Sequence, residues 1–188
     1  GNSTITINGR IVSRGDVGLY GSQVNIGNGG LLLAGIGNDS TYITTNGAAD
    51  TLFNSIVNSD NMSSGNAFAS TNGKIVIKST AGTEIAENAK VRNYNVSANS
   101  SVEITNTGSN GIQIAGEVSN PNGTMTITNQ AGSLKQTSTG LIKNKGTLIA
   151  TNTASGTGVD ISGTVQNDGN MSIVNESGSE GFFVGGTI

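Results

Sequence analysis

The C-terminal half of this chain repeats itself with a period of about 23 residues, a length typical of repeat proteins. Thr124–Asn129 (TMTITN) returns as Thr147–Asn152 (TLIATN) and again as residues 170–175 (NMSIVN). A fixed period of about 20 to 30 residues, with a strand-like segment in each copy, predicts a solenoid in which each repeat contacts only its neighbours. A solenoid exposes a long outer surface, and such surfaces usually bind other molecules rather than transform them. The repeat therefore constrains both the fold and the class of function.

Apolar and polar residues alternate within each copy, as they do in a strand with one buried face. Met125 and Ile127 share one side of the predicted strand, whereas Thr126 and Thr128 lie on the other. Adding one repeat length of about 23 residues from copy to copy gives two columns of inward residues. They are Val102, Met125, Leu148 and Met171, with Ile104, Ile127, Ala150 and Ile173 beside them.

Two further short strands complete each copy. The second strand covers Gly111–Ile114, 158–161 and 181–184. The third strand is the last of each copy and lies at Val118, Ile142, Val165 and Ile188. Three short strands separated by Gly and Asn predict an all-β fold, a parallel β-helix with three faces and coils of about 20–23 residues. In the intervening coil the second strand reads KQTS (135–138), which is so polar that we expect a loose or bulged rung there.

Stacked coils place like residues above like residues, so the turns should form columns of their own. Asn106, Asn129, Asn152 and Asn175 follow the first strand at the same interval, and we predict a structural ladder of amides that hydrogen-bond along the axis. Gly123, Gly146 and Gly169 open the same strand, where a positive φ or a close backbone approach would exclude a Cβ atom.

The N-terminal part has a shorter period of about 20. Ile5 and Ile7 recur as Val24 and Ile26, Ile11 as Leu31, and Val17 as Ile36. Between residues 38 and 72 the pattern dissolves into a Ser/Thr/Asn-rich stretch, in which residues 50–57 have apolar spacing typical of a short helix behind Asp50. We therefore predict N-terminal coils over 1–37, an excursion with a short helix or hairpin over 38–72, and regular coils of the same solenoid over 73–188.

Composition favours this interpretation over disorder. Hydrophobic residues make up 34% of the chain and charged residues 11%, with one proline. Disordered chains usually carry many charges or prolines and lack phased apolar residues. Here the apolar residues are phased, and a core that forms one narrow column needs few of them.

Charge and residue usage exclude several functions. A net charge of −3 argues against a nucleic-acid or anionic-membrane surface, since both require clustered Lys and Arg. The chain has no His and no Cys, the commonest metal ligand and the thiolate source, so we expect no metal site and no cofactor. No apolar run approaches the roughly 20 residues of a membrane helix, and the first residues do not form a signal peptide. We expect a monomeric piece of a longer chain.

The cadence N-x-G-x-aliphatic-x-aliphatic-x-N, with Asn-Gly turns, resembles the filamentous haemagglutinin family of bacterial two-partner secretion exoproteins. The run GRIVSRGDV (9–17) and the run GLLLAG (30–35) are also similar to that family. The resemblance covers most of the chain outside 38–72. It implies a right-handed β-helix, export through an outer-membrane transporter, a secreted or cell-surface location, and a virulence role in adhesion to host cells, matrix or other bacteria. Autotransporter passenger domains share the architecture and stay open as an alternative.

One tripeptide is a candidate binding site. Arg14, Gly15 and Asp16 spell the sequence that integrins recognise, and they lie between two strand-like segments, as a turn would. Recognition requires an exposed loop. The alternative interpretation is an ordinary corner of the β-helix.

A carbohydrate-processing β-helix, such as a tailspike or a lyase, is the second class of function. Such enzymes use clustered carboxylates on one face, often with Ca²⁺. Here Glu103, Asp160 and Asp168 fall on different predicted strands and turns, which argues against an enzyme. Exposed aromatic residues could stack on sugars, although scattered aromatics usually only cover strand faces. They are Tyr20, Tyr42, Tyr94 and Phe183.

Overall fold

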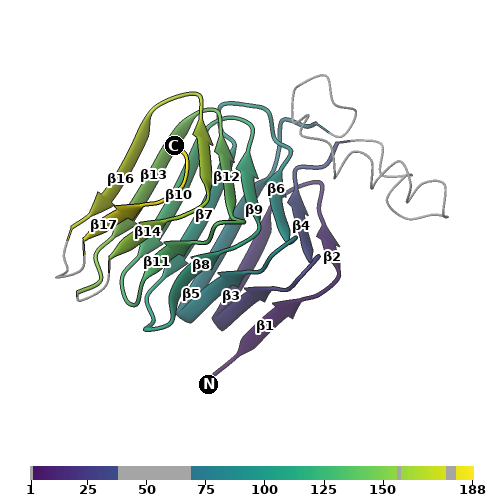
Figure 1. Cartoon of the computed structure of the whole chain (residues 1–188). Helices are drawn as coiled ribbons and strands as arrows, with labels where there is room; N and C mark the ends of the chain where they lie inside the picture. Colours follow the sequence, from purple (N-terminus) through teal and green to yellow (C-terminus); the bar gives the residue numbers. More distant parts are fainter. Residues whose placement is uncertain (1, 38–68, 156–157, 177–180) are drawn as a thin grey trace.

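The computed structural model describes residues 2–37, 69–155, 158–176 and 181–188. Over these residues the chain is all-β, and parallel strands stack into a solenoid of about six turns (Figure 1). The described part contains no helix. The predicted excursion and its short helix fall outside the described residues, apart from residues 69–72, where Ser70 forms a parallel bridge to Asn95. The fold class predicted by the repeat is confirmed.

The strands divide among three faces, two of which merge into one sheet. The first face consists of β7 (Ser101–Asn106), β10 (Thr124–Asn129), β13 (Thr147–Asn152) and β16 (Met171–Asn175). The second consists of β1 (Thr4–Ile7), β8 (Gly111–Ile114), β11 (Leu134–Gln136), β14 (Val159–Ile161) and β17 (Phe182–Val184). Two long strands, β3 (Val17–Ile26) and β5 (Lys74–Ile85), run through both faces and join them.

The third face is a separate sheet of six strands. In spatial order they are β15 (Thr164–Asn167), β12 (Leu141–Asn144), β9 (Glu117–Asn120), β6 (Lys90–Asn93), β4 (Leu31–Ala34) and β2 (Arg10–Val12). Parallel strands need a crossover between them, and here the rest of each coil supplies it. Val118 pairs with Ile142, and Ile142 with Val165, as the sequence predicts.

The first face of the regular coils has the predicted register. Val102, Met125, Leu148 and Met171 pair in succession, and so do the residues two positions further along each strand. Alternate residues point into the solenoid, and side chains such as Val102 and Met125 are fully buried. The period of the sequence is therefore the length of one coil.

The prediction of a loose rung near residue 135 was wrong. Leu134 pairs with Ile112 and Val159, and Gln136 takes the next inward position, so β11 is in register and begins one residue earlier than expected. The polar Gln136 is tolerated in the core because its amide donates hydrogen bonds to the carbonyl oxygens of Gly140 at 2.9 Å and Thr164 at 2.8 Å.

The N-terminal register was predicted only in part. Ile5 pairs with Val24, and Ile7 with Ile26, as expected. Ile11, however, pairs with Leu32 rather than Leu31. Val17 pairs with Ile75 rather than with Ile36, which was its predicted equivalent. The coil that follows β3 and β4 is therefore built from residues beyond 68, and the solenoid continues across the interruption.

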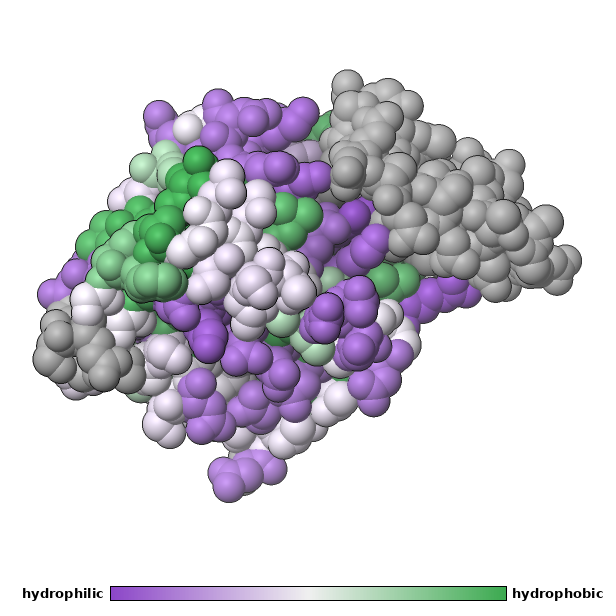
Figure 2. All heavy atoms as spheres, viewed as in Figure 1, coloured by the Kyte–Doolittle hydropathy of each residue, from purple (hydrophilic) through white to green (hydrophobic). Residues whose placement is uncertain are grey.

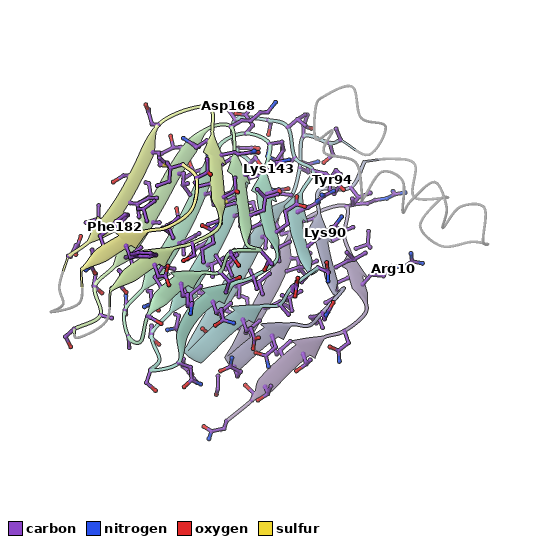
Figure 3. The ribbon with its side chains drawn as sticks, in the orientation of Figure 1. Arg10, Lys90, Tyr94, Lys143, Asp168 and Phe182 are labelled. Carbon is purple, nitrogen blue, oxygen red and sulfur yellow. The ribbon has the colours of Figure 1, made fainter. Side chains whose placement is uncertain are left out.

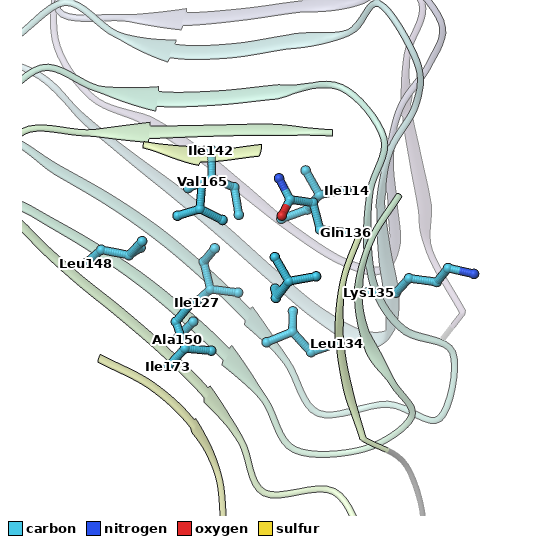
Figure 4. Close-up of a pocket in the computed structure, with 11 residues that line it drawn as sticks. Ile114, Ile127, Leu134, Lys135, Gln136, Ile142, Leu148, Ala150, Val165 and Ile173 are labelled. Carbon is cyan, nitrogen blue, oxygen red and sulfur yellow. The ribbon is translucent and has the colours of Figure 1, made fainter. Parts of the chain in front are cut away.

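The core is one continuous apolar column along the axis. One small gap of about 10 Å³ in this column is lined by residues such as Ile127, Leu134 and Ile161 (Figure 4). A gap of that size barely admits one water molecule. The C-terminal coil exposes its apolar residues, with Met171 at 41% and Phe182 at 44%, and Figure 2 shows hydrophobic side chains gathered at that end.

Candidate functional site

The Arg-Gly-Asp tripeptide occupies the corner between β2 and β3. Arg14 and Asp16 are exposed, and Gly15 is half-buried. The backbone of the corner is held in place. The Gly15 amide donates to the Ser13 hydroxyl at 3.1 Å, and the Gly35 amide donates to the Gly15 carbonyl at 3.2 Å. The corner thus presents the tripeptide to solvent on a fixed loop, and its recognition by an integrin stays a prediction.

The predicted asparagine column forms a hydrogen-bonded ladder. Asn106 donates to Asn129 at 2.9 Å, and Asn129 donates to Asn152 at 2.8 Å. Asn152 in turn donates to Asn175 at 2.8 Å. The Ser79 hydroxyl extends the ladder by donating to Asn106 at 2.9 Å. Asn106, Asn129 and Asn152 are buried, so these hydrogen bonds hold the first corner of successive coils in register.

A second ladder was missed by the sequence analysis. Asn120 donates to Asn144 at 3.2 Å, and Asn144 donates to Asn167 at 2.8 Å, at the end of the third face. Asn93 begins this ladder with a longer contact of 3.4 Å to Asn120. The signal was present, because EVSN, LIKN and TVQN each end a third-face strand. Unequal spacing concealed it, because the first two of these segments are separated by one residue more than the last two.

A buried ion pair was also missed. Arg92 of β6 donates two hydrogen bonds to the Glu117 carboxylate of β9, from Nε at 2.7 Å and from a terminal nitrogen at 2.5 Å. The Ser119 hydroxyl also donates to this carboxylate. Burial alone would lower the pKa of Arg92, but the hydrogen bond and charge of Glu117 outweigh it and the pKa is raised. The two residues are far apart in the sequence and on different coils, so no local motif reveals them.

The aromatic residues do not form a common surface. Tyr94, which was predicted to be outward, is 2% exposed and packs with Leu33 and Ile36. Burial raises the pKa of its hydroxyl, and the nearby Arg92 partly offsets that shift. Tyr20 and Phe183 are well exposed, at 63% and 59%, on different faces. Tyr42 lies outside the described residues.

The three carboxylates singled out in the sequence lie in β7 (Glu103), in β14 (Asp160) and in the turn after β15 (Asp168). Glu103 forms an exposed ion pair with Lys78 at 2.9 Å, and this contact raises the pKa of the lysine. Asp160 accepts a hydrogen bond from Ser162 at 2.6 Å, and Asp168 lies in a distant turn (Figure 3). Among the described residues, no group of three or more His, Cys, Asp or Glu could hold a metal ion. Nor does this part of the chain include a helix long and apolar enough to cross a membrane.

Comparison with known proteins adds no relative. No family model matches the chain, and searches of curated proteins and of solved structures find no significant match. Function must therefore be argued from the solenoid and its surfaces.

Proposed function

We propose that this chain is a segment of a secreted bacterial surface adhesin. In this proposal it acts as a β-helical rod that attaches the cell to host cells, to matrix or to other bacteria. The observation that carries the proposal is the stack of parallel strands from β1 to β17 around one apolar column, with a register shift between Gly21 and Gln23 of β3. A stack of this kind is a rigid spacer with long faces available for contact.

The outer surface of the regular coils supports a binding role. The outward positions of β10 are Thr124, Thr126 and Thr128, and in β13 they continue as Thr147, Ile149 and Thr151. Rows of hydroxyl groups repeat on successive coils at the strand spacing of about 4.8 Å. Such rows suit many weak and repeated contacts. Export through an outer-membrane transporter of the two-partner type belongs to the same proposal and rests on the resemblance of the repeat.

The adhesive role is tested by attachment. Beads coated with the folded chain should bind to epithelial cells, to immobilised matrix proteins or to bacteria. Beads coated with the heat-unfolded chain should not bind, because the surface depends on the stacked coils. The proposal would be contradicted if folded and unfolded chains attached equally to every surface, or if the folded chain attached to no surface.

The Arg-Gly-Asp corner can be tested separately. Asp16→Glu keeps the charge but moves the carboxylate, and it should reduce attachment to integrin-bearing cells at least tenfold if integrins recognise the corner. Asp168→Glu is the matched control, since Asp168 is also an exposed acid in a turn. Equal attachment by both variants would remove the integrin role and leave the rod to bind elsewhere.

The enzymatic alternative has its own test. The purified chain is incubated with a panel of bacterial and host polysaccharides, and reducing ends or unsaturated products are measured. We expect no product, because the carboxylates of the described residues are dispersed. Product formation that a single substitution such as Asp160→Asn abolishes would replace the adhesin proposal with a carbohydrate-processing one.

A further inference from the structure

The outward residues of the second face form one column along the solenoid. Asn25 pairs with Glu84, and Glu84 with Gln113. Lys135, Asp160 and Phe183 continue the same column on the next three coils. Successive coils are about 4.8 Å apart, so the column from Glu84 to Phe183 spans roughly 19 Å. It presents one functional group on each coil.

Two hollows lie beside this column, in a row where every coil after that of Gln23 has a small residue. Gly82 pairs with Gly111, and the same row continues through Ser133, Gly158 and Gly181 on later coils. One hollow of about 280 Å³ is lined by Gln23, Asn25, Glu84, Asn110 and Gln113, with Thr83 and Gly111. A second of about 380 Å³ is lined by Ser133, Lys135, Asp160 and Phe183, with Gly158, Val159, Gly181 and Phe182. The two hollows lie beside the same outward column, one toward each end of it, and we refer to the column and the two hollows together as the groove.

The chemistry of the groove matches hydroxyl groups better than ions. The first hollow is rich in side-chain amides, which both donate and accept hydrogen bonds. Three of them are linked to one another, since Asn110 donates to Gln23 at 3.2 Å and Gln23 donates to Asn25 at 2.9 Å. The charged members of the column are Glu84, Lys135 and Asp160, so acidic and basic groups are mixed and no run of one sign would attract a polyanion or a polycation.

An aromatic ring lies on the last described coil of this column. Phe183 is 59% exposed, and its ring lies over Gly185, where an added Cβ would come within 2.7 Å of the ring. The position is therefore shaped to hold the ring flat against the backbone. An exposed aromatic face packs well against the C–H face of a sugar ring.

We infer that this groove, defined by the outward column from Asn25 to Phe183 and the hollows beside it, binds an uncharged oligosaccharide lying along the solenoid axis. The inference rests on the proposed adhesive function and names the class of receptor. Amide and carboxylate groups would bond to sugar hydroxyls at one end, and Phe183 would stack on a ring at the other. Two carboxylates and a single lysine disfavour sulphated glycans and nucleic acids, which require clustered basic groups.

The test uses the whole chain and defined probes. Uncharged hexasaccharides of glucose, galactose and N-acetylglucosamine are titrated against it, with a heparin hexasaccharide for comparison, and binding is measured by NMR shift changes and calorimetry. We expect at least one uncharged probe to bind and heparin not to bind. Phe183→Ser should weaken the affinity about tenfold by removing the stacking surface. Ser133→Trp should abolish binding by filling the floor of the groove.

Matched controls exist on the other faces. Tyr20→Ser removes another exposed aromatic residue from the first face, and Gln166→Trp places a bulky ring at an exposed outward position of β15 on the third face. Both should change the affinity less than twofold, and circular dichroism should show all four variants folded. Binding of no uncharged probe, or binding that Phe183→Ser and Ser133→Trp leave intact, would overturn the groove.

The groove and the adhesive role fail in distinguishable ways. If coated beads attach to cells but the groove variants attach equally well, the adhesin proposal stands and the groove is wrong. If the folded chain neither attaches to any surface nor binds any probe, both are wrong.

Discussion

The two halves of the third-face sheet differ in what lies on their outer side. One outward column runs along this sheet through Leu33, Arg92, Ser119, Lys143 and Gln166. In the N-terminal half its members are nearly inaccessible, with Leu33 at 0% and Arg92 at 1% exposure. In the C-terminal half, Lys143 is only half-buried and Gln166 is exposed. The N-terminal half of the sheet is thus buried on both sides, and we call it the double-sided half. The C-terminal half has water on its outer side.

This difference explains which strands could be predicted from the periodicity of the sequence. A strand with one wet face alternates, as TMTITN does, whereas a strand buried on both faces need not. The segments LLLA and EVSN are buried almost throughout and carry no clear alternation. The regular coils were therefore predictable from sequence. The double-sided half was not, and it holds the Arg92–Glu117 pair.

The largest expected effect breaks that ion pair. Arg92→Ala leaves the Glu117 carboxylate buried without its cation and should lower the free energy of unfolding by about 3–5 kcal/mol. Lys143→Ala removes a basic residue from the same column in the half-exposed region and should cost about 0.5 kcal/mol or less. Urea denaturation followed by circular dichroism measures both.

A double substitution then separates loss of the pair from loss of packing. Arg92→Met combined with Glu117→Leu removes both charges and should recover most of the lost stability, because no unpaired charge remains. Equal costs for Arg92→Ala and Lys143→Ala would show that the two halves of the sheet do not differ energetically.

The second asparagine ladder should show the same gradient with a smaller effect. Asn93 donates to the Gly73 carbonyl at 3.1 Å and to the Ser100 hydroxyl at 3.0 Å, in the double-sided half. Asn144 donates to Asn167 at 2.8 Å. Asn93→Ala should cost about 2–3 kcal/mol and Asn144→Ala about 1 kcal/mol, since more buried partners lose a hydrogen bond in the first case. Thermal or urea unfolding of the two variants gives the comparison, and a reversed order would refute it.

Alkaline pH should weaken the double-sided half. Burial raises the pKa of Tyr94 above its ordinary value of 10.0, so the unfolded chain releases this proton at a lower pH than the folded chain. The stability that Tyr94 contributes is present below about pH 10 and is lost as the pH rises through the folded-state pKa. Tyr94→Phe should therefore flatten the alkaline decline relative to the unaltered chain. Identical pH profiles of the two chains would show that the hydroxyl is not protected.

The smallest effect concerns the polar core residue of the regular coils. The Gln136 side-chain oxygen is buried and has no hydrogen-bond partner among the described residues, although its amide nitrogen has two. Gln136→Met keeps the volume and removes the unsatisfied oxygen, so it should change the stability by less than about 1 kcal/mol, on the favourable side. Leu134→Ala serves as the comparison, because a buried truncation in the same strand should cost about 2–5 kcal/mol. If Gln136→Met lowered the free energy of unfolding as much as Leu134→Ala, the two hydrogen bonds donated by Gln136 would be a major source of stability in this coil.

The sequence predicted the inward columns of the first and third faces in the regular coils, but not the register of β11 or the sites that join distant segments. The step from Met125 to Leu148 and the column from Asn106 to Asn175 follow from equal coil lengths. The strand around Gln136 was placed wrongly because its coil has a shorter turn before this strand and a longer turn after it. As a result Leu134, rather than Gln136, pairs with Ile112 and Val159. The Arg-Gly-Asp corner was placed correctly in a turn, since its neighbours alternate as strands do.

By itself the sequence determined a stacked β-solenoid, the inward columns of its regular coils and one amide ladder. These depend only on local alternation and on a constant repeat length. The tertiary structure alone decided that Ile75 lies on Val17, that Arg92 reaches Glu117 and that one half of the third-face sheet is buried on both sides. The physical reason is that backbone pairing sets register wherever turns and insertions vary in length, and no periodic signal crosses such a break.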